Sequence, residues 1–517
     1  MGLIAAVVVA MTAASLVQRY LLSRVAVQFD TAALDHLTET LLALPMRYFS
    51  TRRTGDIERR LSGAISVRQF LTTGGVQVLS SVAQLLAALI LMFVFNWVLA
   101  VIYLATIPLY GILMRYSSTR LRPAYDDLEA NYGRYSSSQI DAIRGIETVK
   151  ALAAEDSLRR AMLGRFQTLA KRTFRTQFIV LTYQGLLQLV NFTSFAIFLF
   201  VGALEVIHGG LTLGQFVAFN ALIALANGPV LLLLSMWDQA QQARVQLLRL
   251  DDVLDQEPEQ GRDRERLVPV TTLEGRVELR DVGFHYGGAD APPILEGLTF
   301  SVEPGETIAI VGRSGSGKTT LIKLLAGLYE PTAGTIAFDG HEMHTLDYRT
   351  LRRQIGFVLQ ENYLFNDSLT ANIAFGADEP DPEKLVAAAK AANAHEFVSR
   401  LPLGYDTRVG ESGLRLSGGQ QQRIAIARAL YHSPPILLFD EATSALDTES
   451  ERAVKQSLDE VLLGRTSFVI AHRLSTIRDA DRILVLERGR LVEEGTHDEL
   501  MTRQGLYFYL ASQQLEL

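Results

Sequence analysis

The chain has 517 residues, of which 48% are hydrophobic and 20% charged, and its mean hydropathy is +0.17. This composition excludes a largely disordered chain, and the net charge of −7 offers no basic excess of the kind that binds nucleic acid. Cysteine is absent, which excludes disulfides, thiolate metal sites and cysteine nucleophiles within this chain.

Long uncharged segments dominate the first half of the chain. Residues 71–114 contain no Asp, Glu, Lys or Arg, which is enough for two spans of about 20 residues each, joined by a turn at Asn96 and Trp97. Residues 178–203 and 211–237 are also uncharged, and an apolar stretch precedes Arg19. The sequence therefore predicts five membrane spans, at about 2–22, 74–95, 97–115, 178–203 and 211–237. Pro229 is expected to kink the last one.

Basic residues lie on one side of these spans. The connections at residues 19–75 and 115–175 are rich in Arg and Lys, whereas the connections around Asn96 and at 204–211 contain neither. By the positive-inside rule, both long connections are cytoplasmic. Their periodic charged pattern predicts that the spans continue as helices beyond the bilayer. The protein is thus expected in the plasma membrane as a multi-pass protein.

The character of the chain changes near Asp251. Residues 251–272 are charged at first and poor in apolar residues, and we interpret them as a linker between a transmembrane domain, residues 1–250, and a second domain, residues 273–517. Short apolar runs predict strands in the second domain, at residues 277–279, 307–311, 336–338, 436–439, 467–470 and 483–486. Several are followed by helical patterns, which is typical of a sheet covered on both faces.

A phosphate-binding loop follows the predicted strand 307–311. Residues 312–319 match G-x-x-x-x-G-K-[ST], in which the glycines let successive backbone N–H groups face the phosphates. We expect Lys318 to reach the β- and γ-phosphates and Thr319 to coordinate Mg²⁺. The predicted nucleotide ligands here are Gly312, Arg313, Ser314, Gly315, Ser316, Gly317, Lys318, Thr319 and Thr320.

Two carboxylates end the apolar run 436–439. Asp440 is placed to hold Mg²⁺, and Glu441 to polarise the attacking water as the catalytic base. Such a pair at a strand end is usually only solvated, but a phosphate loop elsewhere in the chain requires a partner of this kind.

A second phosphate-binding helix start lies between these motifs, at Leu416, Ser417, Gly418, Gly419 and Gln420, ahead of a helix predicted at 421–430. One phosphate group does not need two such sites in one subunit. LSGGQ is the signature of the ATP-binding cassette (ABC) family, and the chain resembles an ABC transporter of the exporter type. The resemblance implies an all-α transmembrane domain, type I exporter-like, followed by an α/β P-loop NTPase cassette with an α-helical subdomain.

Further roles come from this resemblance. Tyr286 resembles the aromatic residue that stacks on adenine, and Gln360 the glutamine that touches Mg²⁺. Asp447 matches a loop that communicates across a cassette dimer. His472 matches the histidine at the γ-phosphate and is expected to assist Glu441 in catalysis. Residues 407–411 resemble an exporter-specific loop near the coupling helices.

The membrane half resembles the family less specifically. Residues 45–57 and 139–150 are similar to its first and second coupling regions, although an exposed amphipathic helix would have the same pattern. In this family two cassettes pair head to tail, so the resemblance implies a second half-transporter as partner, in a homodimer with two ATP sites. ATP and Mg²⁺ are the implied cofactors, and lipid and a transported substrate the other partners.

These observations predict ATP-driven export by alternating access. A soluble cassette ATPase would lack the apolar spans, an importer usually keeps its permease on another chain, and a dead cassette would have lost Lys318, Asp440 or Glu441. The substrate is predicted to be a peptide or protein, and lipid or drug export remains the alternative.

The number of spans carries one more expectation. Five spans place Met1 on the outer side, whereas exporters of this family have six spans and both termini inside. The first apolar run corresponds to the family's second span, so the first helix is expected to be missing. A chain of this kind is expected to bind ATP and to be able to hydrolyse it, but to transport poorly or not at all.

Overall fold

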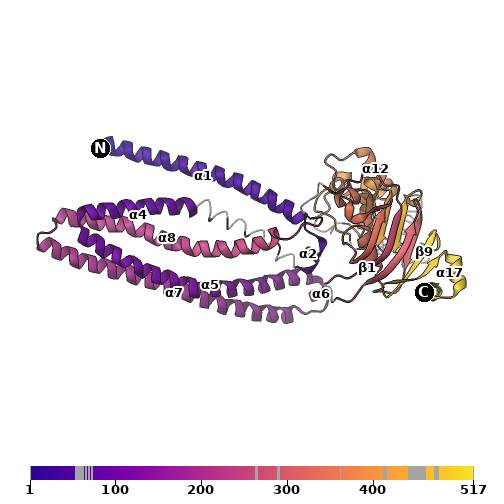
Figure 1. The fold of residues 1–517 in the computed structure, drawn as a ribbon, viewed down its shortest axis with the longest axis horizontal. Helices are drawn as coiled ribbons and strands as arrows, with labels where there is room; N and C mark the ends of the chain where they lie inside the picture. Colours follow the sequence, from indigo (N-terminus) through magenta and orange to yellow (C-terminus); the bar gives the residue numbers. More distant parts are fainter. Residues whose placement is uncertain are drawn as a thin grey trace. The chain divides into compact units, whose positions relative to one another are not determined.

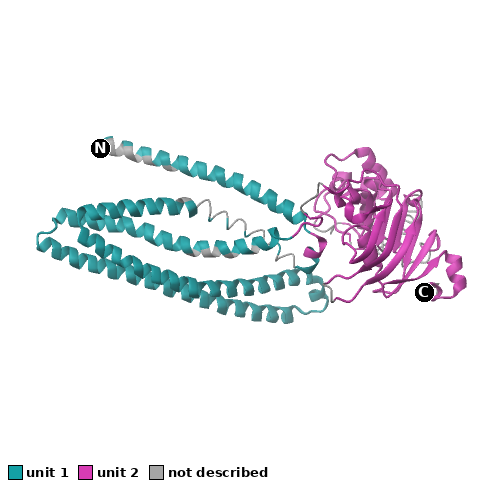
Figure 2. Cartoon of the chain, in the orientation of Figure 1, with its two compact units in different colours: residues 1–44, 49–256 teal, residues 45–48, 257–517 magenta. Residues whose placement is uncertain are grey.

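The computed structural model describes residues 2–52, 57, 63, 67, 70, 74–261, 266–287, 291–360, 362–410, 416–440, 461–470 and 477–515. The chain divides into two compact units, residues 1–44 with 49–256 and residues 45–48 with 257–517 (Figure 2). We call the first the helical unit and the second the α/β unit. The fold is therefore a helical membrane domain followed by an α/β domain, as the sequence predicted.

Long helices make up the helical unit (Figure 1). They are α1 (Gly2–Leu42), α4 (Gly75–Phe95), α5 (Trp97–Arg144), α6 (Ile146–Ala151), α7 (Glu155–Ile207) and α8 (Leu213–Leu254). The short helix α2 (Met46–Thr51) crosses the boundary between the units. The predicted turn at Asn96 is confirmed: this residue separates α4 from α5, and its side-chain oxygen accepts a hydrogen bond from Leu99 N at 3.1 Å. The predicted helical extensions beyond the apolar parts of α5 and α7 are confirmed as well.

Four helices among the described residues are long and apolar enough to cross a membrane. Their bounds are Gln77–Phe95, Trp97–Arg144, Glu155–Ile207 and Leu213–Trp237, which contain or nearly match four of the predicted spans. The fifth predicted span, residues 2–22, lies in α1, where several side chains are outside the described residues, and it stays a prediction. Pro229 lies inside α8, which continues as one helix past it.

Small residues let the membrane-spanning helices approach closely. Ala88 of α4, Ala100 of α5 and Ala226 of α8 are fully buried in one cluster with Phe198 and Phe219. The two phenylalanine rings stack with centroids 5.2 Å apart. Close packing of this kind is the main attraction between helices in lipid, because burial against lipid tails has no hydrophobic gain.

The described residues of the α/β unit form two sheets, whose strands are drawn as arrows in Figure 1. Its strands are β1 (Val277–Phe284), β2 (Leu295–Val302), β3 (Thr307–Val311), β4 (Ala333–Phe338), β5 (His341–Glu342), β6 (Ile355–Val358), β7 (Ile436–Asp440), β8 (Thr466–Ile470), β9 (Arg482–Glu487) and β10 (Arg490–Gly495). The first sheet is antiparallel, in the order β2-β1-β4-β5. The second has the order β10-β9-β3-β8-β7-β6, and its strands are parallel except for β10.

Helices cover the sheets and add a helical region. They are α9 (Lys318–Leu325), α10 (Tyr348–Arg353), α11 (Leu369–Ile373), α12 (Pro382–Ala391), α13 (His395–Ser399), α14 (Gly418–Tyr431), α17 (His497–Arg503) and α18 (Leu506–Leu515). One apolar core lies around α9 and both sheets, and a second joins α11–α14 to strands β6 and β7.

The six strands predicted from apolar runs are confirmed, and β2, β5, β6 and β10 were missed. Buried and solvent-facing side chains alternate along β2, which interrupts its apolar pattern. β6 has four residues and β5 two, and β10 is a half-exposed edge strand. Continuous burial, as in β7, is what makes a strand easy to recognise.

The predicted linker differs from expectation in its first and middle parts. Its first four residues belong to α8, which ends at Leu254. Glu259 accepts two hydrogen bonds from Arg352, at 2.9 and 2.6 Å, and Gln260 accepts one from Tyr348 N at 2.9 Å and donates one to Leu346 O at 2.7 Å. A segment that looked solvated is therefore fastened to the α/β unit, by partners about ninety residues further along the chain.

Candidate functional site

The phosphate loop connects β3 to α9 and is shaped by its glycines. Gly317 has φ +100°, a conformation that favours glycine, and a Cβ there would lie 2.5 Å from Leu295 Cδ2. A Cβ on Gly312 would overlap the Leu486 carbonyl oxygen and lie 2.6 Å from Ser316 Oγ. Neighbouring backbone therefore excludes a side chain at Gly312, whereas at Gly317 the positive φ and the Leu295 side chain disfavour one.

The ammonium group of Lys318 and the hydroxyl group of Ser316 point into this loop. The Lys318 Nζ donates to the carbonyl oxygens of Gly312 and Arg313, at 2.8 and 3.1 Å, and the residue is 8% exposed. The buried Ser316 Oγ has no hydrogen-bond partner among the described residues. An ammonium held by carbonyls and an unpaired hydroxyl are donors that a phosphate can satisfy, so the residues present fit a nucleotide phosphate.

The sheet order brings the next two predicted residues together. β7 and β3 both pair with β8, and all three strands are parallel, so their carboxyl ends share one edge. Thr319, in the first turn of α9, donates through Oγ1 to Asp440 Oδ1 at 3.2 Å, and Asp440 is 1% exposed. A hydroxyl and a carboxylate are hard oxygen donors of the type that Mg²⁺ prefers.

Tyr286 belongs to an aromatic group that the sequence revealed only in part. Its ring lies edge-on to Phe284 and Tyr329, with centroids 4.9 and 5.2 Å away, and its hydroxyl is 3.1 Å from Thr320 Oγ1 in α9. These aromatic residues line a cavity of about 440 Å³. Phe284 is near Tyr286 in the sequence, but no local pattern marked Tyr329.

The edge of the sheet that carries Asp440 is also where β6 ends, because β6 and β7 pair in parallel, so Gln360 comes from that edge, whereas the signature motif lies at the start of α14. Gln360 is exposed and follows β6 closely. Ser417 caps α14: its Oγ accepts from Gln420 N at 3.3 Å, and Gln420 Oε1 accepts from Ser417 N at 3.0 Å. Every hydrogen bond described for Leu416–Gln420 is made within this segment and α14. The helix start can offer the N–H groups of Gly418 and Gly419 to a phosphate.

Three predicted site residues, Glu441, Asp447 and His472, lie outside the described residues. The same holds for Glu411 at the end of the exporter-specific loop. Their roles stay predictions.

Sequence reasoning missed a clamp between the signature helix and the segment after Gln360. Arg428 of α14 donates to Asn372 O at 2.7 Å, to Asn372 Oδ1 at 2.8 Å and to Tyr363 O at 2.9 Å. The fully buried Asn372 also bonds the backbone N and O of Phe365, both at 2.9 Å. Burial lowers the pKa of the Arg428 guanidinium. Polarity at buried positions of α11 and α14 is the only sequence signal of this clamp.

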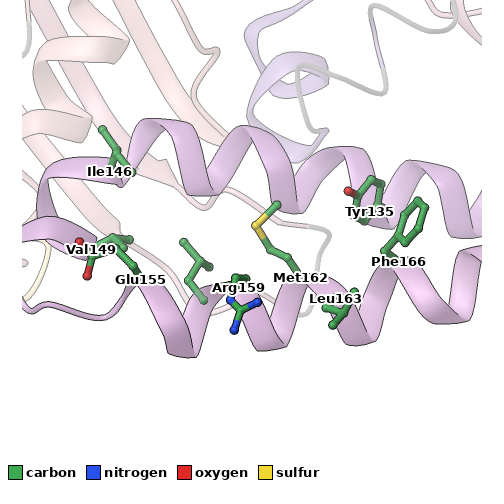
Figure 3. Close-up of a pocket in the computed structure, with 9 residues that line it drawn as sticks. Tyr135, Ile146, Val149, Glu155, Arg159, Met162, Leu163 and Phe166 are labelled. Carbon is green, nitrogen blue, oxygen red and sulfur yellow. The ribbon is translucent and has the colours of Figure 1, made fainter.

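An apolar groove marks the region that resembles the second coupling region. Tyr135 of α5, Ile146 and Val149 of α6, and Met162 and Phe166 of α7 line a depression of about 470 Å³ (Figure 3). The rings of Tyr135 and Phe166 are tilted against each other with centroids 5.5 Å apart. Ile146 is 46% exposed, which places apolar surface on this turn between two helices.

Comparisons with known proteins agree with this arrangement. One family model, the ABC transporter transmembrane region, matches residues 1–230, and a second, ABC transporter, matches residues 295–444. The chain is 40% identical over 497 residues to the leukotoxin translocation ATP-binding protein LktB of Bibersteinia trehalosi, covering 95% of this chain and 69% of that protein. It is also 40% identical over 495 residues to the toxin RTX-III translocation ATP-binding protein of Actinobacillus pleuropneumoniae, with the same coverage.

A solved structure extends the likeness to the whole fold. The structure of a bacterial Atm1-family ABC exporter with ATP bound superposes with a TM-score of 0.87 and 32% sequence identity, and covers 96% of this chain and 87% of the other. The chain therefore belongs to the ABC transporter family, as a half-transporter of the exporter type that uses ATP hydrolysis to drive export across the inner membrane.

Proposed function

We propose that this exporter translocates a polypeptide. The observation that carries the proposal is the 40% identity, over 95% of the chain, to proteins named for the translocation of leukotoxin and of toxin RTX-III. Identity over that length includes the membrane-spanning helices, which form the path of any substrate. Export of a lipid or a drug is the alternative.

We further propose how the nucleotide is held. The backbone of residues 312–317 and Lys318 bind the phosphates, and Lys318 exchanges its bonds to Gly312 O and Arg313 O for bonds to phosphate oxygens. Tyr286 stacks on the base. Mg²⁺, when bound with ATP, neutralises charge on the phosphates, and Thr319, Asp440 and Gln360 are the residues that would hold it.

Glu441 is proposed as the catalytic base. In the sequence it directly follows Asp440, whose buried carboxylate at the end of β7 accepts a hydrogen bond from Thr319 after the phosphate loop, and its proposed role is to orient the attacking water. His472 follows two residues after β8, the strand between β3 and β7, and is proposed to contact the γ-phosphate.

The active form is proposed to be a homodimer with two composite sites. Among the described residues, the hydrogen bonds of the signature segment are made within itself and α14, which is consistent with its N–H groups serving the ATP of another subunit. Asp447 would communicate between the two sites. The α6 turn with its apolar groove would serve as a coupling region that transmits closure of the cassettes to the helices.

The substrate proposal can be tested by an ATPase stimulation screen in lipid nanodiscs. Unfolded polypeptides, lipids and amphipathic drugs are compared as stimulators of ATP turnover. Polypeptide export predicts stimulation by polypeptides at lower concentration than by the other two classes. Stimulation by lipids or drugs alone would replace the proposal with the alternative.

The composite sites can be tested by complementation. Lys318→Ala and Ser417→Arg chains are each expected to be inactive as homodimers. Mixed dimers restore one intact site, with the phosphate loop of one chain and the signature of the other, and should recover ATP turnover. Mixtures that stay as inactive as each variant alone would rule out the in-trans arrangement.

A further inference from the structure

The last membrane-spanning helix, α8, continues past a proline that removes one of its backbone hydrogen bonds. Gly228 and Pro229 lie inside α8, in the middle of its membrane-spanning part. Proline has no N–H, so the carbonyl of Leu225, four residues earlier, loses its helical partner, and the proline ring also pushes that carbonyl outward. In hydrocarbon an unpaired backbone carbonyl is costly, because no water can satisfy it.

A side chain from another helix meets this carbonyl. Gln84 of α4 donates through Nε2 to Leu225 O at 3.4 Å. The bond pairs the carbonyl that Pro229 leaves without its helical donor with an amide that would itself be costly in lipid. Gln84 therefore compensates for the hydrogen bond that Pro229 removes, although 145 positions separate the two residues in the sequence.

Asn227, in the same turn of α8, forms hydrogen bonds with two further helices, α5 and α7. Asn227 accepts a hydrogen bond from the Tyr103 hydroxyl of α5 at 3.3 Å and donates to Asn191 Oδ1 of α7 at 2.9 Å. With Gln84, three other helices bond to residues 225–227. Polar side chains within membrane spans are uncommon, so their convergence on one turn indicates a functional role.

The turn also separates two packed layers of α8. On one side, Ile223 and Ala226 are buried in the cluster that contains Phe198 and Phe219. On the other side, Val230 and Leu234 are buried in a different cluster with Tyr110. Packed layers move as units, so bending of α8 is concentrated where the backbone ladder is interrupted.

We propose that residues 225–229 of α8 are a hinge used in the export cycle, and that the side chains of Gln84, Tyr103, Asn191 and Asn227 are positioning residues that hold it through hydrogen bonds. The hydrogen bonds hold α8 in the conformation of this structure, and breaking them lets the segment that leads to the α/β unit reorient. ATP-driven reorientation then works against these hydrogen bonds.

The first test is a double-mutant experiment on ATP turnover in nanodiscs. In the wild type, Gln84→Met removes the donor while keeping the side-chain length, and should raise kcat about threefold with KM for ATP unchanged, the scale of one interhelical hydrogen bond in a membrane. Pro229→Ala restores the N–H that bonds Leu225 O, so it should lower kcat. In that background Gln84→Met should have no further effect, because Gln84 is redundant.

Matched controls separate the hinge from general damage to the membrane helices. Gln188→Met changes an amide of α7 that makes no interhelical hydrogen bond in the part of the chain described, and Pro108→Ala changes the proline of α5 in the membrane. Both should leave kcat within twofold of the wild type. Tyr103→Phe removes the hydroxyl that donates to Asn227, and it should raise kcat as Gln84→Met does. Equal effects of Gln84→Met with and without Pro229 would overturn the proposal.

The second test measures the bend itself. Because the chain contains no cysteine, spin labels can be placed at Leu213→Cys and Leu248→Cys, exposed positions on the two sides of the hinge about 50 Å apart along α8. Labelled chains are diluted with unlabelled chains so that each dimer carries one pair. A distance that changes between nucleotide-free and ATP–vanadate states in the wild type, but not in Pro229→Ala, supports the hinge. A distance that stays constant in the wild type contradicts it.

Discussion

The two units of this exporter hold their residues in place by different means. In the α/β unit, specific polar partners join distant segments: the Asp339 carboxylate accepts bonds from the backbone N–H groups of Glu274, Gly275 and Arg276 at 2.7, 3.1 and 2.8 Å. In the helical unit, packed apolar side chains hold the membrane-spanning parts together. Three interhelical hydrogen bonds meet at one turn of α8, and the cytoplasmic extensions of α5 and α7 are joined by further polar contacts, among them Thr176 with Ala124 O and Arg172 with Asp127.

The difference follows from the solvent around each unit. A helix satisfies its own backbone, so a span in lipid needs only an apolar surface and small residues for close approach. A mixed sheet with loops leaves many buried N–H and C=O groups, and each needs a partner. A polar side chain within a membrane span is therefore a stronger indication of a functional role than a polar side chain in the α/β unit.

The largest expected effect tests the chemistry of the α/β unit. Glu441→Gln keeps the shape of the side chain but removes the proposed base, so hydrolysis should slow by about 10²–10⁴-fold while ATP binding persists. Turnover and nucleotide affinity of the purified variant in nanodiscs are the measurements. Near-normal turnover would remove Glu441 from the catalytic role.

Two glycines of the phosphate loop test how strongly local geometry is specified there. Gly317→Ala adds a Cβ at φ +100° that meets Leu295, whereas Gly315→Ala adds one at φ +78° in open space. The second change should destabilise by about 1–2 kcal/mol, the cost of a left-handed residue, and the first by more. Thermal unfolding and ATP affinity check this order. A smaller loss of stability for Gly317→Ala than for Gly315→Ala would mean that the Leu295 side chain moves aside at little cost.

The Arg428 clamp tests whether distant polar partners carry stability in the α/β unit. Arg428→Lys keeps a charge but loses the planar fork that reaches Asn372 and Tyr363, and should cost about 1.5–3 kcal/mol. Arg400→Lys is the matched control, because Arg400 makes an exposed pair with Glu396 one helical turn away and should change stability by less than about 0.5 kcal/mol. Equal denaturation midpoints for the two variants would contradict the comparison between buried and exposed arginines.

The smallest effect on the protein itself is expected from two cysteine substitutions in the helical unit, which report the membrane topology and should leave ATP turnover unchanged. Gly209→Cys, in the connection between α7 and α8, should react with an impermeant thiol reagent from outside the cell, and Ser137→Cys in α5 should not. Labelling of whole cells against permeabilised cells measures the accessibility. The opposite pattern would reverse the topology inferred from Lys and Arg.

Sequence patterns predicted the elements whose physical signal is local. Uncharged stretches located α4, α5, α7 and α8, and the continuous apolar run 436–439 located β7. The glycine and lysine spacing of residues 312–319 located the phosphate loop, because the backbone curl and the helix start are properties of adjacent residues. Glu441, Asp447 and His472 stay predictions.

By itself the sequence determined the apolar helices and the cassette with its nucleotide motifs, and the distribution of Lys and Arg predicts the side of the membrane for each connection. Only the tertiary structure decided which distant residues meet. The pairing of Thr319 with Asp440 depends on the strand order β3-β8-β7, the Arg428 clamp on the contact of α14 with α11, and the bond from Gln84 to Leu225 O on the packing of α4 against α8. A local residue pattern reflects the burial and backbone geometry of its own helix or strand. The partner of a buried polar group depends instead on how distant segments pack together.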